Sequence, residues 1–159
     1  MKTYYYHAEQ WLAIDIQMAW EFFSSPQNLA LITPPDMNFI IKSSIENQEI
    51  YEGMLIDYTV KPLFGIPLAW KTKIVQVNKP FSFMDTQLKG PFHLWEHTHS
   101  FIEKDGGVLV KDQVKYQMPL GILGTLAHNL LVSKRIEGIF SYRKEVLKKL
   151  LEKDGINTY

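Results

Sequence analysis

The last third of the chain carries apolar residues at helical spacing. No proline occurs from Gly121 to about Lys153, and the apolar positions follow the period of about 3.6 residues typical of an α-helix. These positions are Leu123, Leu126, Leu130, Ile136, Ile139, Phe140, Val146, Leu147, Leu150 and Leu151. At about 1.5 Å per residue, roughly 30 residues span about 45 Å. Such a helix needs a large concave surface to bury its apolar stripe, so we expect the rest of the chain to supply one.

The region before this helix predicts a strand, two short helices and then strands only. Tyr and Trp at alternating positions favour a strand from Thr3 to about Ile14, and Asp15 can cap a helix over Ile16–Ser24. A second, brief helix begins at Ser25-Pro26 and is stopped by Thr33-Pro34-Pro35. Alternation of apolar and polar residues then predicts strands near 39–45, 53–61, 67–77, 82–89, 92–104 and 107–118.

The links between these strands are short, which favours antiparallel hairpins. Asp105-Gly106 is a typical two-residue hairpin turn. The order therefore predicts an α+β fold, in which a seven-stranded antiparallel sheet is wrapped on the long C-terminal helix. No linker or internal repeat interrupts the pattern, so we expect one domain over residues 1–159.

Composition narrows the class of partner. The 17 basic and 17 acidic residues cancel, which argues against nucleic acid as a partner. No apolar run reaches the roughly 18 residues of a membrane span, so we expect no stable membrane insertion. The chain has no cysteine and begins without a signal-peptide pattern, and the expected location is cytoplasmic. The sequence does not identify a protein partner.

One end of the predicted sheet collects apolar turns rich in proline and glycine. Its exposed positions include Leu63, Phe64, Ile66, Leu120 and Ile122, whereas the turns at the opposite end are mostly polar. Two interpretations stay open: these loops close the core, or they form the mouth of an apolar cavity between sheet and helix. The two are compatible, because loops can cover a mouth until a ligand arrives.

Strand parity places polar side chains inside the fold. Lys111, Gln113, Lys115 and Gln117 share the wet face of the last strand, so Asp112 and Tyr116 point inward. Across the hairpin, His99 lies directly opposite Asp112, and residues of matching parity share that face. The predicted ligand-binding residues are Tyr58, Trp70, Thr72, Trp95, His97, His99, Asp112 and Tyr116 from the sheet, with Leu123, Leu126 and Leu130 from the helix.

The inward polar residues allow several roles. His99 and Asp112 can form a satisfied internal pair, or they can face a ligand together with His97. A metal held by the two histidines and Asp112, and acid–base catalysis by His99 and Asp112, are further alternatives without a specific signature. No phosphate-binding glycine loop or other cofactor motif occurs, so we expect no cofactor and no metal. Arg143 borders the apolar stripe and can turn toward a carboxylate.

Several segments together resemble one superfamily. They are SSPQNLALITPP (24–35), GPFHLWEHTHSF (90–101), DQVKYQMPLGILG (112–124) and FSYR (140–143). They are similar to the START-like, or SRPBCC, superfamily, in a bacterial branch whose domain is sometimes fused to epimerase-like proteins. The resemblance implies a helix-grip fold, a curved sheet around a long helix with a deep hydrophobic pocket. The superfamily includes lipid carriers, ligand-binding allergens and polyketide aromatase/cyclases, and it supplies no catalytic residues that map onto this chain.

The expected function is therefore binding of an apolar or amphipathic small molecule, lipid-, polyketide- or isoprenoid-like, in an internal hydrophobic cavity. Two alternatives stay open. One is an enzyme of the cyclase or dehydratase type that uses a His/Asp pair in the cavity. The other is a protein-interaction module that uses the apolar loops at the mouth.

Overall fold

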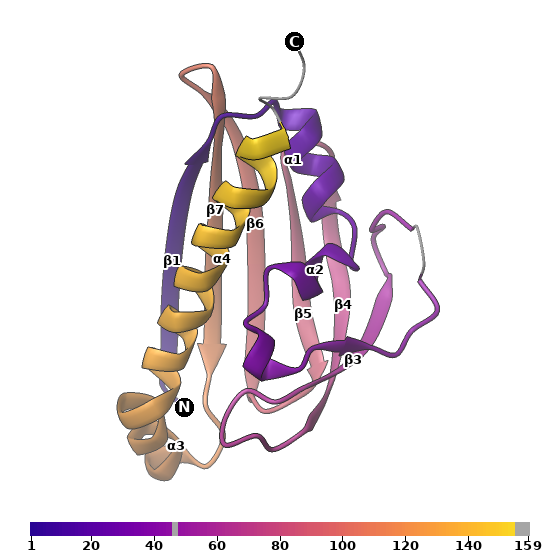
Figure 1. Cartoon of the computed structure of the whole chain (residues 1–159). Coiled ribbons are helices and arrows are strands. Elements are labelled where there is room, and N and C mark those ends of the chain that lie inside the picture. Colours follow the sequence, from indigo (N-terminus) through magenta and orange to yellow (C-terminus); the bar gives the residue numbers. More distant parts are fainter. Residues whose placement is uncertain (46–47, 155–159) are drawn as a thin grey trace.

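The computed structural model describes residues 1–45 and 48–154 of the chain. It contains a curved, seven-stranded antiparallel sheet in the order β1-β7-β6-β5-β4-β3-β2 (Figure 1). The strands are β1 (Thr3–Leu12), β2 (Ile40–Ile41), β3 (Leu55–Val60), β4 (Leu68–Asn78), β5 (Ser82–Lys89), β6 (Leu94–Lys104) and β7 (Gly107–Gln117). The predicted α+β helix-grip architecture is confirmed, although the strand expected over 39–45 is reduced to the two residues of β2.

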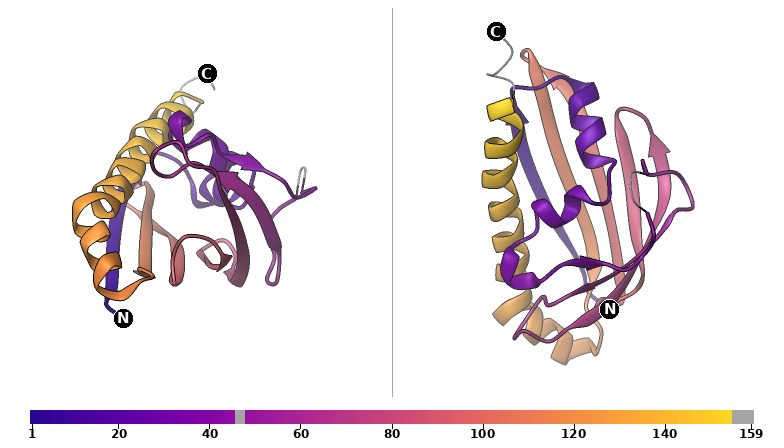
Figure 2. Two further views of the ribbon diagram at one scale, coloured as in Figure 1. Left: turned by 90° about the horizontal axis from the view of Figure 1, so that it is seen from below. Right: turned by 45° about the vertical axis from the view of Figure 1, so that its right-hand side comes forward.

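The long C-terminal helix lies along β1 and β7, at one side of the concave face (Figures 1 and 2). It has three parts: α3 (Gly121–Ala127), the π-helical segment η2 (His128–Val132) and α4 (Ser133–Asp154). A π-helix has wider turns than an α-helix, so residues four apart lie above one another in η2. The single regular helix expected from the sequence is thus interrupted by one wide turn.

Two short helices cross the concave face between β1 and β2, together with the 3₁₀ turn η1 (Pro35–Met37). Helix α1 (Ile16–Phe23) is capped as predicted, because the Asp15 carboxylate accepts a hydrogen bond of 2.7 Å from the backbone N–H of Met18. Helix α2 (Asn28–Leu31) begins two residues later than the Pro26 start expected from the sequence.

The β6–β7 hairpin turns at Asp105-Gly106, as predicted. Both residues have positive φ, 52° and 75°, which a two-residue hairpin of the common type requires. Lys104 therefore pairs with Gly107, and this register places His99 directly opposite Asp112. The predicted pairing of these two positions is confirmed.

The core is densest at the end of the sheet next to α1. The indole of Trp20 packs edge-to-face against Phe83 and Phe101, with ring centroids 6.1 and 6.2 Å apart. Trp20, Leu12 and Val108 are fully buried there. At the opposite end, near α3, no comparable helix fills the concave face of the described residues (Figure 2). No helix among the described residues is long and apolar enough to cross a membrane.

Candidate functional site

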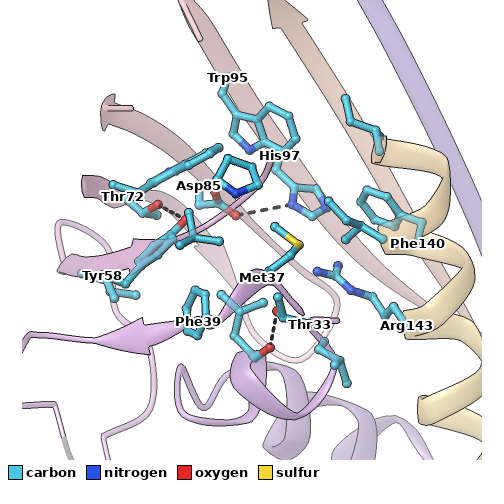
Figure 3. A pocket seen from close by; sticks show the side chains of 18 of the residues that line it. Thr33, Met37, Phe39, Tyr58, Thr72, Asp85, Trp95, His97, Phe140 and Arg143 are labelled. Carbon is cyan, nitrogen blue, oxygen red and sulfur yellow. Dashed lines mark hydrogen bonds and ion pairs between the residues drawn. The ribbon is translucent and has the colours of Figure 1, made fainter. Parts of the chain in front are cut away.

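A cavity of about 440 Å³ lies on the concave face, between the sheet and α4. The walls come from β3 to β6, from α4 and from the segment 22–39, and most of its lining side chains are aliphatic or aromatic (Figure 3). Its polar groups are few, and they come from the sheet, from α4 and from the segment 22–39. They include Thr72, Asp85, His97, His99 and Arg143.

Six of the side chains predicted to bind a ligand line this cavity. They are Tyr58, Trp70, Thr72, Trp95, His97 and His99. The hydroxyls of Tyr58 and Thr72 lie 3.4 Å apart, and the two aromatic rings of Trp70 and Trp95 meet edge to face. Strand parity therefore places these residues correctly, while their contact with a ligand stays a prediction.

Two histidines and two aspartates form a closed polar cluster at the sheet side of the cavity. His97 Nε2 lies 2.7 Å from Asp112 Oδ1, and His99 Nε2 lies 3.1 Å from Asp85 Oδ2. The remaining ring nitrogens complete the square: His99 Nδ1 is 3.2 Å from Asp112 Oδ1 and His97 Nδ1 is 3.8 Å from Asp85 Oδ2. Asp112 lies behind the histidines and does not line the cavity.

The protonation of this cluster follows from its contacts. An ionised carboxylate only accepts hydrogen bonds, so Nε2 of both histidines carries the hydrogen. Burial and the neighbouring His99 lower the pKa of His97, against the hydrogen bond with Asp112. Burial also disfavours the charged form of His99, but its contacts with Asp112 and Asp85 outweigh that effect and raise the pKa of His99. A proton that enters the cluster therefore belongs on His99.

Arg143 supplies the positive charge of the cluster. Its Nη1 lies 3.5 Å from Asp112 Oδ1, and its guanidinium carbon lies 4.8 Å from the centre of the Phe140 ring. Burial raises the pKa of Asp112, but hydrogen bonds from both histidines and the charge of Arg143 hold that pKa well below its usual value. Two carboxylates and one guanidinium leave one negative charge, which a single imidazolium on His99 balances.

Three groups of this cluster are also spaced for a metal ion. Asp85, His97 and His99 each offer one ligand atom, and these atoms lie within 4.8 Å of one another. A divalent cation at this point would have to replace the hydrogen bond between His99 and Asp85 and the proton of the imidazolium. The nearby Arg143 adds a repelling positive charge that opposes a cation at this point.

Tyr116 lies in a different environment from the one expected. Its hydroxyl is 2.8 Å from Nε2 of His128, whose ring stacks on Tyr4 with centroids 3.6 Å apart. This cluster fills the space between β1, β7 and η2, because the curvature of the sheet carries the end of β7 toward the helix. Tyr116 is therefore buried against the helix and does not line the cavity.

The helix residues expected to bind a ligand face away from the cavity. Leu123, Leu126 and Leu130 are between 55% and 68% exposed. The inward positions are Gly124, His128 and Val132, which η2 aligns at four-residue intervals with Ile136. Leu126 and Leu130 lie two residues from these positions, roughly half a turn around the helix, so they point to the opposite side.

The residues expected at the mouth divide into two groups. Leu63, Phe64 and Ile66, on the loop between β3 and β4, line the opening. Leu120 and Ile122 do not line it; they are 77% and 89% exposed, on the outer side of the turn into α3. Leu120 and Gly121 both have positive φ, and this reversal turns the start of α3 away from the loop.

A second arginine of α4, Arg135, links this helix to two other segments at the cavity opening, the β3–β4 loop and η1. Arg135 donates a 2.7 Å hydrogen bond from Nε to the carbonyl of Pro62 and another of 2.7 Å from Nη2 to Asp36. It therefore holds the β3–β4 loop and η1 against the helix.

Some residues of the site have no signal in the sequence. Thr33 and Met37 come from the connection between α2 and β2, which the sequence indicates only as a link (Figure 3). Phe39 belongs to the strand expected over 39–45, but it precedes β2, which begins at Ile40. Asp85 has a weak signal, since it shares strand parity with the buried Phe83. Arg143 shows the inward turn toward a carboxylate that its position allowed.

Comparison with known proteins shows the fold of this chain and does not show its function. No protein-family model matches the sequence, and no curated protein matches it. Among solved structures, the di-domain ARO/CYC StfQ from the steffimycin biosynthetic pathway is similar with a TM-score of 0.71 and 11% identity, over 96% of this chain and 52% of StfQ. A Rhodobacter sphaeroides protein is similar with a TM-score of 0.68 and 14% identity, over 94% of this chain and 92% of that one.

A point mutant of norcoclaurine synthase from Thalictrum flavum, in complex with a transition-state analogue, is similar with a TM-score of 0.64 and 17% identity. The match covers 97% of both chains. At these identities the likeness shows a shared fold only. The chain has the helix-grip fold of these structures, a curved antiparallel sheet around a long C-terminal helix.

Proposed function

We propose that this protein binds an apolar or amphipathic small molecule, of the lipid, polyketide or isoprenoid kind, in the cavity between the sheet and α4. The observation that carries the proposal is the cavity of about 440 Å³ with its aliphatic and aromatic walls. Removing apolar ligand surface from water stabilises a complex by about 25 cal/mol per Å², so shape and burial supply most of the affinity. The solved complex of norcoclaurine synthase with a transition-state analogue supports a small molecule as a guest of this fold.

The lining polar groups orient the guest in this proposal. Tyr58 and Thr72 present hydroxyls, and His97 and His99 present imidazoles, on the sheet side of the cavity. Asp112 acts indirectly, because it holds His97 and His99 in place from behind. Trp70 and Trp95 give flat apolar surface for rings or chains.

The first experiment extracts the purified protein with organic solvent and examines the extract by mass spectrometry, alongside titration with the neutral fluorescent probe Nile red. We expect a co-purified apolar compound or saturable probe binding. Ile139→Trp puts an indole into the cavity and should reduce probe binding by at least about tenfold. Ile102 lies on the outer face of β6, so Ile102→Trp is the matched control and should bind like the wild type. Equal probe binding by both variants would contradict the proposal.

A second candidate is an enzyme that uses the His/Asp cluster on a cavity-bound substrate. The observation that favours it is the direct hydrogen bonding of two cavity-lining histidines to two carboxylates, an arrangement suited to proton transfer. His99→Ala and Asp112→Asn should then abolish turnover of a candidate substrate while guest binding persists. If turnover by these variants equals that of the wild type, the enzyme interpretation fails.

A third candidate is a protein-interaction module that uses the apolar rim. The exposed side chains of Phe64, Leu120 and Ile122 favour it, since large exposed apolar patches mark interaction sites. Leu120→Ser and Ile122→Ser, which change residues that do not line the cavity, should remove a bound protein partner without changing Nile red affinity. A partner retained by both variants would argue against this role.

A further inference from the structure

Arg143 is buried without enough acceptors for its donors. The residue is 6% exposed, its Nε–H has no hydrogen-bond partner, and its one contact with a carboxylate is 3.5 Å long. A guanidinium carries five N–H donors, and a bond of that length is at the limit of hydrogen bonding. Burying such a cation is costly unless further acceptors are supplied.

The carboxylate oxygen that Arg143 contacts already receives a shorter hydrogen bond from another donor. Asp112 Oδ1 receives its short hydrogen bond, 2.7 Å, from His97, and Asp85 Oδ2 receives one from His99. Arg143 is therefore the outermost and weakest partner of the cluster.

The guanidinium points toward the space where a guest would lie. Arg143 lines the cavity from α4, and Figure 3 shows its guanidinium directed from the helix into the pocket, between Met37 and Phe140. The Phe140 ring, 4.8 Å from the guanidinium carbon, supports the cation from one side. An acceptor on a guest in the cavity can thus reach the side chain without displacing a protein partner.

We propose that Arg143 binds a carboxylate of the guest, so that the ligand class of this cavity is an apolar molecule bearing one carboxylate group. This inference rests on the proposed function and adds the chemistry of the polar end of the ligand. A carboxylate fits because its two oxygens match the planar donor edge of a guanidinium and because its charge is opposite. The aromatic and aliphatic walls take the rest of the molecule.

The net charge of the cluster formed by Asp85, His97, His99, Asp112 and Arg143 predicts that binding of a carboxylate is coupled to the uptake of one proton by the protein. With one imidazolium the cluster is neutral, and a carboxylate would add one negative charge. His97 is the group placed to take up this proton, since it lines the cavity and since burial and the neighbouring His99 lower its pKa before a guest adds negative charge. The charged or titratable groups that face it are Asp85 from β5, His99 from β6, Asp112 from β7 and Arg143 from α4.

The test compares dodecanoate with its methyl ester as competitors of Nile red. We expect the wild type to bind dodecanoate at least about tenfold more tightly than the ester, because a charge-assisted hydrogen bond favours one of two guests of equal chain length. Arg143→Met should remove this preference and leave the affinity for the ester within about twofold. Lys148→Met removes a positive charge from the exposed part of the same helix, and this control should keep the preference.

Because Arg143→Met leaves Asp112 without its cation, Arg143→Lys provides a second variant that keeps the charge and loses the planar donor edge. It should fold like the wild type and reduce the preference for dodecanoate without abolishing it. In the wild type, dodecanoate affinity should rise as the pH falls from about 8 to about 6, while the affinity for the ester stays level.

The outcomes separate the two proposals. If the wild type binds acid and ester equally, or if both Arg143 variants weaken both guests alike, the carboxylate assignment is overturned and the proposed function stands. If the wild type binds neither guest and no Nile red, the proposed function fails, and the assignment of Arg143 fails with it.

Discussion

The two halves of the concave face use the same sheet and the same helix but are completed differently. Next to α1, Trp20, Leu12 and Val108 have no exposed surface, although Phe23 of α1 and the neighbouring Phe83 also line one end of the cavity. Next to α3, a cavity remains, and large apolar residues such as Phe64 and Ile122 face outward. The comparison teaches that one half supplies the packing that holds the fold, which allows the other half to keep an open interior.

The largest effect is expected in the filled half. Trp20→Ala removes the indole that contacts Phe83 and Phe101 and that donates a 2.7 Å hydrogen bond to Glu49. We expect a loss of about 4 kcal/mol in the free energy of unfolding, measured by urea denaturation. Trp95→Phe, a conservative change in the cavity wall, is the comparison and should cost less than about 1.5 kcal/mol. Equal losses would mean that the two halves contribute alike.

The polar cluster is the part of the open half whose loss should cost most. Asp112→Asn removes the negative charge that receives His97 and faces Arg143, so a buried cation is left uncompensated. We expect the free energy of unfolding to fall by about 3 kcal/mol in urea denaturation at neutral pH. A loss below about 1 kcal/mol would show that the cluster contributes little to stability.

The pH dependence of the free energy of unfolding should further distinguish the two halves of the concave face. The pKa of Asp112 is depressed in the folded state, so its stabilisation is fully present above its unfolded pKa of about 4 and is lost as the pH falls toward the folded value. The stability difference between wild type and Asp112→Asn should therefore narrow below about pH 4. The difference between wild type and Trp20→Ala comes mainly from lost packing. The lost hydrogen bond from Trp20 also helps Lys79 to keep the pKa of Glu49 low, so this difference should narrow less over the same range than the difference for Asp112→Asn. Parallel curves for the two variants would contradict this account.

The contacts of Arg135 at the cavity opening should affect the rate at which a ligand dissociates more than the free energy of unfolding. Arg135→Ala removes the hydrogen bonds to Pro62 and Asp36 that hold the β3–β4 loop and η1 to α4. We expect bound Nile red to dissociate roughly fivefold faster in stopped-flow displacement, with less than about 1 kcal/mol lost in unfolding free energy. An unchanged dissociation rate would mean that guests leave by another route.

The smallest effect is expected on the outer side of the helix. Leu126→Gln and Leu130→Gln change exposed residues, so each should alter the free energy of unfolding by less than about 0.5 kcal/mol and leave Nile red binding unchanged. Val132→Gln, on the inward face, is the matched comparison and should be clearly destabilising. A large effect at Leu126 would indicate that this side is covered in solution.

The sequence predicts the sheet and the inward face of its strands, because both depend on local rules. The pleat alternates side chains, and the Asp105-Gly106 turn sets the register that pairs His99 with Asp112. Asp85 escapes this reasoning because its partner His99 lies on the next strand, across a turn without a clear register signal, and β4 pairs with β5 through irregular register.

The helix residues of the site were less predictable. An α-helical period over the whole C-terminal segment does not reveal the wide turn at His128–Val132, so the inward positions before it could not be assigned from the sequence. Thr33, Met37 and Phe39 reach the cavity through a connection whose path depends on tertiary packing. Arg143 could be singled out because an arginine beside an apolar stripe needs an acceptor.

The π-helical turn has a consequence for how this end of the molecule can change. A wide turn contains one residue more than an ordinary one, so deletion of a single residue within His128–Val132 would rotate α3 by about 100° relative to α4. The buried ring of His128 would lose its alignment with Tyr4 and Tyr116, and a different set of leucines would turn toward the sheet. The one additional residue in the π-helical turn thus determines which face of α3 packs against the sheet.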